Sequence, residues 1–425
     1  MKKITVLLTL LLFVLNTSAQ QQFRIWQGEE SSRFSISNYQ FMTFSENGAK
    51  ITIGSNSTDA SATFNVAEID SIVMIHQVKV AYDNSKDTAI VTIPETLEKY
   101  VTAEVKGAHV IITNTNEMNE VECELTGEAS DGSFTYIGSY KSSIRLAGVN
   151  LTSNQGAAID IKCGKRIALI LEDGTENTLV DYVDGAQKAC LYCKGHLEVE
   201  GGGTLNVTGN LSHAIKTKEY LQLKKSTGTI NIVKSNSDGI HVGQYYRQDG
   251  GTVNITSTTY NDGIQAEIAT LDDDVTPDPD KEFNGQVFIN GGSINIEIAR
   301  DEDQKAIKCD SLVTITGGTL TFTVSSNGSR GIQTEGSMIV GAEGSTTAAP
   351  IITITATGGL CTKNVHKTDP HRCMGIKVEG DLSVYSGVMK VIATGSKGRS
   401  IKVTGNYNKY GGTVYASPSI KAANL

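Results

Sequence analysis

Apolar and polar residues alternate in short runs along most of the chain, and one such run recurs about every 25 residues. Each copy has a glycine-containing turn followed by a stretch with apolar side chains at every second position. Since successive side chains of a strand point to opposite faces, each run predicts a strand with one buried face. The clearest copies are Gly202–Val207, Thr227–Ile232, Gly250–Ile255, Gly291–Ile296 and Gly317–Phe322.

A second strand pattern in each repeat is a small residue followed by an inward isoleucine and a polar residue. A third, looser strand completes the repeat, as at Leu221–Leu223 and Val287–Ile289. No run has a helical period, and a fixed period of strands and turns is typical of a solenoid. Since crossovers between parallel strands are nearly always right-handed, residues 81–425 are predicted to form an all-β, right-handed parallel β-helix with three strands per coil. The isoleucines are Ile159, Ile215, Ile240, Ile264, Ile307, Ile332, Ile376 and Ile401.

The polar position between the two inward side chains is asparagine in four copies. We expect these side chains to point outward and to stack from coil to coil as a ladder. They are Asn206, Asn231, Asn254 and Asn295.

The first 80 residues do not share the repeat. Lys2 and Lys3 precede an apolar run and a segment of small residues that ends at Ala19, which predicts a secretory signal over residues 1–19. The protein is therefore expected outside the cytoplasm, secreted, periplasmic or at the cell surface. Residues 20–80 contain the single tryptophan, Trp26, and are predicted to form a small β-rich domain or a cap on the solenoid.

Charge and hydropathy exclude two classes of partner. The net charge of −9 becomes −11 once Lys2 and Lys3 are removed, which argues against a general affinity for nucleic acid. No later stretch approaches the roughly 20 apolar residues that a membrane span needs. We expect a monomer.

The seven cysteines do not have the spacing of a disulfide framework. Cys190 and Cys309 occupy inward positions and are predicted to be small core residues. Cys361 and Cys373 bracket an insertion and are expected to form a disulfide that closes it. The alternative is a metal site in which these two thiols are joined by histidines at positions 366 and 371.

Two acids lie at the same distance before an inward isoleucine in successive coils. Asp238 and Asp262 should therefore stack about 4.8 Å apart, with the amides of Asn236 and Asn261 beside them. Calcium suits such a place, because it takes six to eight oxygen ligands from carboxylates, amides and backbone carbonyls. Asp301 and Asp303 of the next coil are included in the predicted set. The alternative is that Asn and Asp are here because they favour turns.

The position after each inward isoleucine forms a polar stripe. Long basic and amide side chains on a flat sheet can bind the carboxylates of an acidic polysaccharide, and Tyr260 could add a stacking face together with Tyr245 and Tyr246. Alternatively the stripe is a solvated face that pairs with nearby acids, among them Glu267 and Glu335. The predicted ligand-binding residues of the stripe are Lys216, His241, Gln265, Lys308 and Gln333.

The turns Asp238-Gly239-Ile240 and Asp262-Gly263-Ile264, with their Gly-Gly-x-Ile-x-Ile strands, resemble the calcium-binding β-helix proteins of the carbohydrate-binding domain-containing family, within the pectate-lyase-like superfamily. The resemblance covers about residues 80–415. It implies a protein that binds calcium and plant-type polysaccharides, cellulose and acidic sugars such as polygalacturonate, without known cleavage. The family often has two adjacent acids where this chain has Ser237-Asp238 and Asn261-Asp262, and later coils have Lys305 and Arg330 at that position.

Three functions follow from these observations. The first is a secreted, non-catalytic polysaccharide-binding β-helix that calcium stabilises. The second is a calcium-dependent uronate lyase, in which Arg330 or Lys305 would take the α-proton. The third is a surface adhesin or scaffold whose N-terminal domain binds a protein partner.

Overall fold

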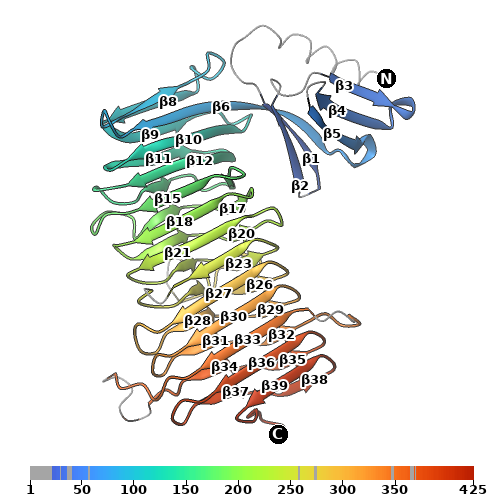
Figure 1. The fold of residues 1–425 in the computed structure, drawn as a ribbon, viewed down its shortest axis with the longest axis vertical. Helices are drawn as coiled ribbons and strands as arrows, with labels where there is room; N and C mark the ends of the chain where they lie inside the picture. The colour runs from blue at the N-terminus through green and yellow to red at the C-terminus, as the bar shows by residue number, and fades with distance from the viewer. Residues whose placement is uncertain are drawn as a thin grey trace.

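The computed structural model describes residues 22–28, 30–35, 41–55, 58–256, 259–271, 275–345, 349–363, 368 and 370–425. The described chain is built from β-strands, and its helical segments are two short 3₁₀ turns, η1 (Glu46–Gly48) and η2 (Val66–Glu68). A tall column of coils carries a smaller group of strands at its N-terminal end (Figure 1).

The N-terminal strands pack around a separate small core. Strands β1 (Gln22–Gln27), β2 (Glu30–Ser35) and β6 (Ser71–Asp83) pair antiparallel, and β3 (Phe41–Ser45), β4 (Lys50–Ser55) and β5 (Thr58–Asn65) form a second antiparallel sheet. The predicted boundary between residues 80 and 81 lies within β6, whose first half pairs with β1 and whose second half pairs with the column. The core side chains are Phe23, Ile25, Phe34, Ile51, Ile53 and Phe64.

Antiparallel strands close the open end of the column. Strand β7 (Thr88–Thr92) pairs antiparallel with β6, and β8 (Val101–Lys106) pairs antiparallel with β9 (Ala108–Asn114). The backbone groups of the first parallel strands are thereby paired rather than left as an exposed edge.

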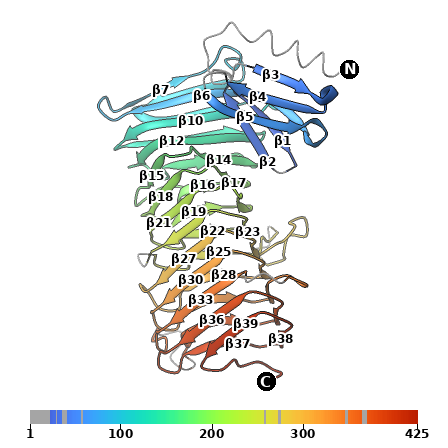
Figure 2. The same ribbon diagram turned by 45° about the vertical axis from the view of Figure 1, so that its right-hand side comes forward.

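Below this cap the strands stack in three parallel ladders, which Figures 1 and 2 show from two sides. The first ladder consists of β6, β10 (Val121–Ala129), β12 (Ser142–Thr152), β14 (Ile167–Leu171), β17 (Leu197–Glu200), β20 (Leu221–Leu223), β23 (Tyr245–Gln248), β26 (Gln286–Ile289), β29 (Val313–Ile315), β32 (Met338–Val340), β35 (Leu382–Val384) and β38 (Tyr407–Lys409). The second ladder starts from the same long β12 and continues through β15 (Glu176–Val180), β18 (Thr204–Gly209), β21 (Thr229–Ser235), β24 (Thr252–Ile255), β27 (Ser293–Ile298), β30 (Thr319–Val324), β33 (Ile351–Ala356), β36 (Val388–Ala393) and β39 (Thr413–Ser417).

The third ladder is a sheet of its own. It runs from β9 through β11 (Gly132–Gly138), β13 (Ile159–Ile161), β16 (Ala189–Cys193), β19 (His213–Thr217), β22 (Ile240–Val242), β25 (Ile264–Ala266), β28 (Lys305–Cys309), β31 (Arg330–Thr334), β34 (Met374–Val378) and β37 (Arg399–Val403). The predicted parallel β-helix with three strands per coil is confirmed.

The inward side chains of the three ladders form one continuous apolar core. Leu205 and Val207 of β18 and the isoleucines at 230 and 232 of β21 are fully buried, as the alternation predicted. The second glycine of several Gly-Gly turns has a left-handed backbone: Gly251 and Gly292 have φ of +75°, and a Cβ on Gly251 would lie 2.8 Å from the carbonyl oxygen of Thr227. Left-handed backbone and close stacking of turns both require glycine there.

The cysteines are all buried free thiols. Cys190 and Cys309 are core residues, as predicted. The predicted disulfide is wrong for this structure, because the two thiols face different partners. The Sγ of Cys361 lies 3.5 Å from a carboxylate oxygen of Glu302, whereas that of Cys373 lies 3.8 Å from the carbonyl oxygen of Val324.

The asparagine ladder is present on the second ladder of strands. The side-chain amide of Asn231 donates to Asn206 at 2.8 Å, Asn254 donates to Asn231 at 2.8 Å, and Asn295 donates to Asn254 at 2.9 Å. Each interior amide thus both donates and accepts, and adjacent coils are held in register by side chains as well as by backbone.

Asn231→Ala is expected to lower the free energy of unfolding by ~1 kcal/mol, because it removes two ladder hydrogen bonds at a partly exposed position. Asn295→Ala removes a single ladder hydrogen bond, the one to Asn254, and serves as the matched control with about half the effect. Thermal unfolding followed by circular dichroism measures both. Equal effects of the two substitutions would contradict a role for the ladder.

Candidate functional site

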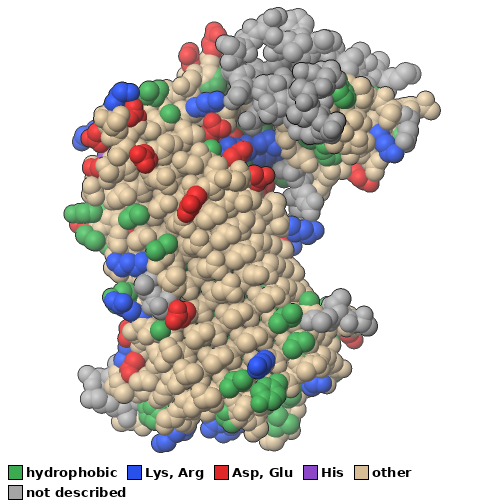
Figure 3. All heavy atoms as spheres, viewed as in Figure 1, with side chains coloured by type: hydrophobic (Ala, Val, Ile, Leu, Met, Phe, Trp, Pro, Cys, Tyr) green, Lys and Arg blue, Asp and Glu red, His purple; other side chains and the backbone are tan. Residues whose placement is uncertain are grey.

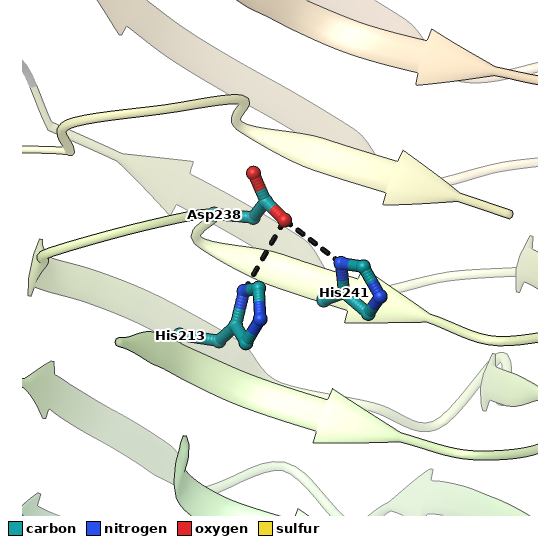
Figure 4. Close-up of side chains that lie close together, drawn as sticks. All are labelled: His213, Asp238 and His241. Atoms are coloured by element: carbon teal, nitrogen blue, oxygen red, sulfur yellow. Dashed lines mark hydrogen bonds and ion pairs between the residues drawn. The ribbon is translucent and has the colours of Figure 1, made fainter. Parts of the chain in front are cut away.

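Two histidines converge on one buried carboxylate at the start of the third ladder's middle strands. His213 begins β19, and Asp238 lies in the turn before β22, which contains His241. The Oδ2 of Asp238 lies 2.8 Å from Nδ1 of His241 and 3.2 Å from Nδ1 of His213 (Figure 4). Strand pairing places His213 and Asp238 at the same position of neighbouring coils, which is why their side chains meet.

Burial and hydrogen bonding act against each other on these three groups. Burial would raise the pKa of the Asp238 carboxyl, but the close imidazole of His213 and the hydrogen bond from His241 hold this pKa below its ordinary value. Burial lowers the pKa of His213. Burial also opposes the charged form of His241, but its contacts with Asp238 and Glu267 outweigh this and raise its pKa.

Asp262 stacks on Asp238, as the sequence predicted, but it faces different partners. Its backbone N–H donates to Oδ1 of Asp238 at 3.0 Å, and its own Oδ1 accepts from the backbone N–H of Lys305 at 2.7 Å. Asn261 also donates to Oδ1 of Asp238, at 2.6 Å. The side chain of Asn236 lies apart from these groups and donates to the carbonyl oxygen of Asn210.

The other two predicted acids belong to a different cluster. Asp303 pairs with Arg330 at 2.6 Å and with Nδ1 of His371 at 2.9 Å, and Nζ of Lys305 lies 3.7 Å away. Burial opposes the charge of Asp303, but the surrounding cations lower its pKa to about 2. Asp301 lies 3.2 Å from Nζ of Lys363.

This cluster also contains the two residues considered as a lyase base. The guanidinium of Arg330 is buried against Asp303, and Lys305 donates to the backbone carbonyl of Asp303 at 2.6 Å. Burial lowers the pKa of Lys305. Of the alternative ligands at the insertion, His366 lies outside the described residues, and His371 is bound to Asp303.

The predicted calcium ligands do not fit calcium in this arrangement. Calcium takes six to eight oxygen ligands. Here one oxygen of Asp238 faces two imidazole nitrogens and the other accepts two N–H groups, while Asp303 faces cations. The donors around Asp238 are two nitrogens and one oxygen, which is a different kind of metal chemistry.

The polar stripe has the predicted register. Strand pairing aligns Lys216, His241, Gln265, Lys308 and Gln333 along the third ladder. Acids two positions further on bind several of them: His241 lies 3.1 Å from Glu267, Gln265 donates to Glu267 at 2.5 Å, and Gln333 donates to Glu335 at 2.7 Å. Part of the stripe is therefore already paired with acids, as the alternative of a solvated, paired face predicted.

An aromatic row that was not predicted from the sequence lies on the outer face of the first ladder. His196 and Tyr220 stack with ring centroids 4.4 Å apart, and Tyr220 and Tyr245 stack at 4.7 Å. The pairing of β14, β17, β20 and β23 puts Arg166 in the same row, immediately before the first ring. The sequence does carry a signal for this row. In each strand of the first ladder from β14 to β23, a polar or aromatic residue comes directly before the first inward residue.

The row ends in a small hollow. Phe283, from the insertion between β25 and β26, meets Tyr245 edge to face with centroids 5.8 Å apart, and Phe288 of β26 meets Phe283 at 5.3 Å. The hollow has a volume of about 170 Å³, and the polar side chains of Arg247 and Asn290 complete its lining.

Polar contacts anchor the segment that carries Phe283. Lys281 binds the carboxylate of Glu219 at 2.6 Å, and Gln244 donates to the carbonyl oxygen of Glu282 at 2.8 Å. Asn284 bonds the backbone of Ala269 through both atoms of its amide, at 2.7 and 2.9 Å. Phe283 is thereby held beside the row although 52% of it is exposed.

The other tyrosines named from the sequence are elsewhere. Tyr246 is in the core and donates to Gln248 at 2.7 Å. Tyr260 is exposed under the guanidinium of Arg300, 4.6 Å from the ring centroid. Neither lies in the hollow.

The opposite end of the row meets the N-terminal hairpin. Two guanidiniums lie over the ring of Trp26, that of Arg24 at 5.1 Å and that of Arg166 at 5.4 Å from the ring centroid. Arg24 also binds Glu200 at 3.3 Å, and Arg33 binds the buried Glu122. Figure 3 shows acidic and basic side chains gathered at this junction, whereas the middle of the same face has few charges.

Comparison with known proteins identifies the family. The family model described as carbohydrate-binding domain-containing protein matches residues 106–422. The chain belongs to this family. The resemblance inferred from the sequence is therefore confirmed, and the match covers the column of coils from the end of β8 onward.

Two relatives illustrate how far the likeness extends. A protein of the same description from Acetivibrio thermocellus is 32% identical over 95 residues, which are 20% of this chain and 32% of that protein. The match thus spans about a third of that curated relative. A solved structure of the polysaccharide lyase-like protein from C. thermocellum, a gadolinium derivative, has a TM-score of 0.49 and 23% identity over 63% of this chain and 98% of that one.

Among the described residues, no helix has the length and apolar character needed to cross a lipid bilayer.

One buried acid outside the predicted set is expected to affect stability. Asp181, after β15, accepts hydrogen bonds from the backbone N–H groups of Asn210 and Leu211, and burial raises its pKa to about 6. Because the folded-state pKa lies above the unfolded one, this group favours folding fully at low pH and loses that contribution as pH rises from about 4 through 6.

Asp181→Asn should remove the loss of stability that accompanies ionisation of Asp181, because the amide keeps an acceptor oxygen but carries no charge. We expect the variant to gain on the order of 1 kcal/mol over the wild type at pH 7, after allowance for partial solvent screening, and nothing at pH 3.5. Melting temperatures at the two pH values measure the difference. A gain of equal size at both would show that charge is not the cause.

Proposed function

We propose that this protein is a secreted, non-catalytic polysaccharide-binding β-helix that holds its glycan along the aromatic row of the first ladder. Membership of the carbohydrate-binding domain-containing family supports a carbohydrate ligand. The hollow formed by Tyr245, Phe283 and Phe288 is the reason for placing the glycan on this surface.

The chemistry of the hollow suits a sugar ring. A pyranose presents C–H groups on its faces and hydroxyls around its rim, so it needs apolar rings beside directional polar groups. Phe283 is half exposed, and it is held in place by the anchored segment rather than by burial. The side chains of Arg247 and Asn290 stand beside the rings and offer N–H donors to hydroxyl or carboxylate oxygens.

The row gives the site its length. From Arg166 to Tyr245 it crosses three inter-strand spacings, about 14 Å. A polymer lying parallel to the column axis would therefore pass the hollow and several further side chains. This arrangement favours a chain over a single sugar.

Basic side chains favour an acidic glycan such as polygalacturonate over neutral cellulose. Arg166, Arg247 and Lys281 all lie along the row or beside the hollow. Each is paired with an acid, Arg247 with Asp249 at 3.0 Å, so a uronate carboxylate would compete with an existing contact.

Export is proposed from the sequence of residues 1–19, which lie outside the described part of the chain. Lys2, Lys3 and the apolar run before Ala19 support it.

Tyr245→Ala and Phe283→Ala are each expected to weaken polysaccharide binding about tenfold, because each removes one wall of the hollow. Isothermal titration calorimetry with oligogalacturonates and with cello-oligosaccharides measures the affinities. Tyr415→Ala, which removes an exposed ring of the last strand, is the matched control and should leave binding unchanged.

Unchanged affinity in both hollow variants would place the glycan elsewhere. Unsaturated uronate products, detected by their ultraviolet absorbance during incubation with polygalacturonate, would support the lyase alternative.

Arg247→Gln tests the preference for acidic sugars. We expect weaker binding of oligogalacturonate, by about tenfold at low ionic strength and by less as salt screens the charges, with cello-oligosaccharide binding little changed. Titrations at two salt concentrations check this. An equal loss for both ligands would mean that Arg247 contributes shape and hydrogen bonds rather than charge.

A further inference from the structure

The pair of histidines and Asp238 present three ligand atoms to one point. His213, Asp238 and His241 each offer one ligand atom, and the three atoms lie within 4.8 Å of one another. Nδ1 of each histidine faces Oδ2 of Asp238. Ligand atoms bonded at about 2.0–2.1 Å to a tetrahedral metal would be about 3.3 Å apart. The observed nitrogen-to-oxygen separations are 2.8 and 3.2 Å, so a small spreading of the side chains would admit an ion.

An unpartnered nitrogen points into the same place. His213 is 7% exposed, and its Nδ1 has no hydrogen-bond partner within the described part of the chain. The contact with Asp238 is within ion-pairing distance, but its geometry is not that of a hydrogen bond. A buried polar atom without a partner is costly, and a metal–ligand bond would satisfy it.

The groups around the three ligands have the arrangement found behind metal ligands. Nε2 of His241 lies 3.1 Å from a carboxylate oxygen of Glu267, while Oδ1 of Asp238 accepts from Asn261 and from the backbone N–H of Asp262. A carboxylate behind a ligating histidine and hydrogen bonds to a ligating carboxylate both fix ligand orientation. The three ligands are thus held from behind by separate residues.

We propose that His213, Asp238 and His241 form a Zn²⁺ site that joins the coil of β19 to the coil of β22, with the fourth position open to water. Two imidazoles and one carboxylate form a donor set that zinc accepts and that calcium does not favour. The site lies on the third ladder and the aromatic row lies on the first, so this proposal is independent of the proposed glycan surface.

The repeat in the sequence explains how two neighbouring coils supply the three ligands. Position 213 of one coil stacks on position 238 of the next, and His241 follows three residues later on the same turn and strand. In the following coil the same two positions are Asp262 and Gln265, and after that Lys305 and Lys308. Within the paired third-ladder strands, the pattern His, Asp and His occurs at this single junction.

The first test is metal binding by the full-length chain, purified without a histidine tag and treated with chelator. Titration calorimetry is expected to give one Zn²⁺ per chain, and Zn²⁺ is expected to raise the melting temperature where the same concentration of Ca²⁺ does not. Co²⁺ should give the intense visible absorption of tetrahedral coordination.

His213→Gln and His241→Gln are each expected to weaken Zn²⁺ binding at least tenfold and to remove the Co²⁺ absorption, with the metal-free circular dichroism spectrum unchanged. His109→Gln is the matched control, because His109 also contacts a carboxylate, that of Asp131 at 3.2 Å, but is not among the three grouped ligands. It should bind Zn²⁺ as the wild type does.

The proposal is overturned if the wild type takes up no Zn²⁺, if the His213→Gln/His241→Gln double variant still binds one equivalent, or if Ca²⁺ stabilises the protein as Zn²⁺ does. Should a single variant fail to fold, Asp238→Asn keeps the size and hydrogen-bonding capacity of the side chain, and it must also bind Zn²⁺ more weakly. Glycan binding that persists in these variants would separate this result from the proposed function.

Discussion

The backbone hydrogen bonds between successive coils are the constraint on which the rest of the molecule depends. They fix neighbouring strands about 4.8 Å apart and in a constant register, so a residue in one coil lies directly beside its counterpart in the next. Every side-chain position therefore belongs to a column that runs along the molecule. Each side chain in a column must therefore be compatible with an identical or a complementary side chain at that spacing.

The chain meets this constraint differently on each face. Asparagines such as Asn231 can both donate and accept, so like amides form a ladder. Rings such as Tyr220 stack on their neighbours. Carboxylates repel one another, and Asp238 instead lies between imidazoles on one side and N–H donors on the other. The candidate sites arise where a column changes residue type, because only there do unlike groups meet at close range.

The same constraint explains how much could be predicted from the sequence. Periodicity alone was enough for the ladders, the asparagine stack and the stacking of Asp262 on Asp238, because these depend only on register. His213 could not be recognised from the pattern of acids, because it lies in the same column as Asp238 but one coil earlier, where the residue type differs. Phe283 could not have been placed, since it lies in an insertion where the repeat gives no register and polar anchors decide its position. The expected disulfide was wrong for a related reason: closeness along an insertion says nothing about the direction of each thiol.

Strand β6 makes the N-terminal part and the column one mechanical unit. Its first half belongs to the antiparallel sheet with β1, and its second half is the opening strand of the first ladder, with no linker between them. A rotation of one part against the other would bend a continuous strand, so the hairpin that carries Trp26 keeps a fixed orientation to the aromatic row. An exchange of N-terminal modules between relatives would have to cut upstream of Ser71, because a cut at residue 80 would leave the column without most of its first strand.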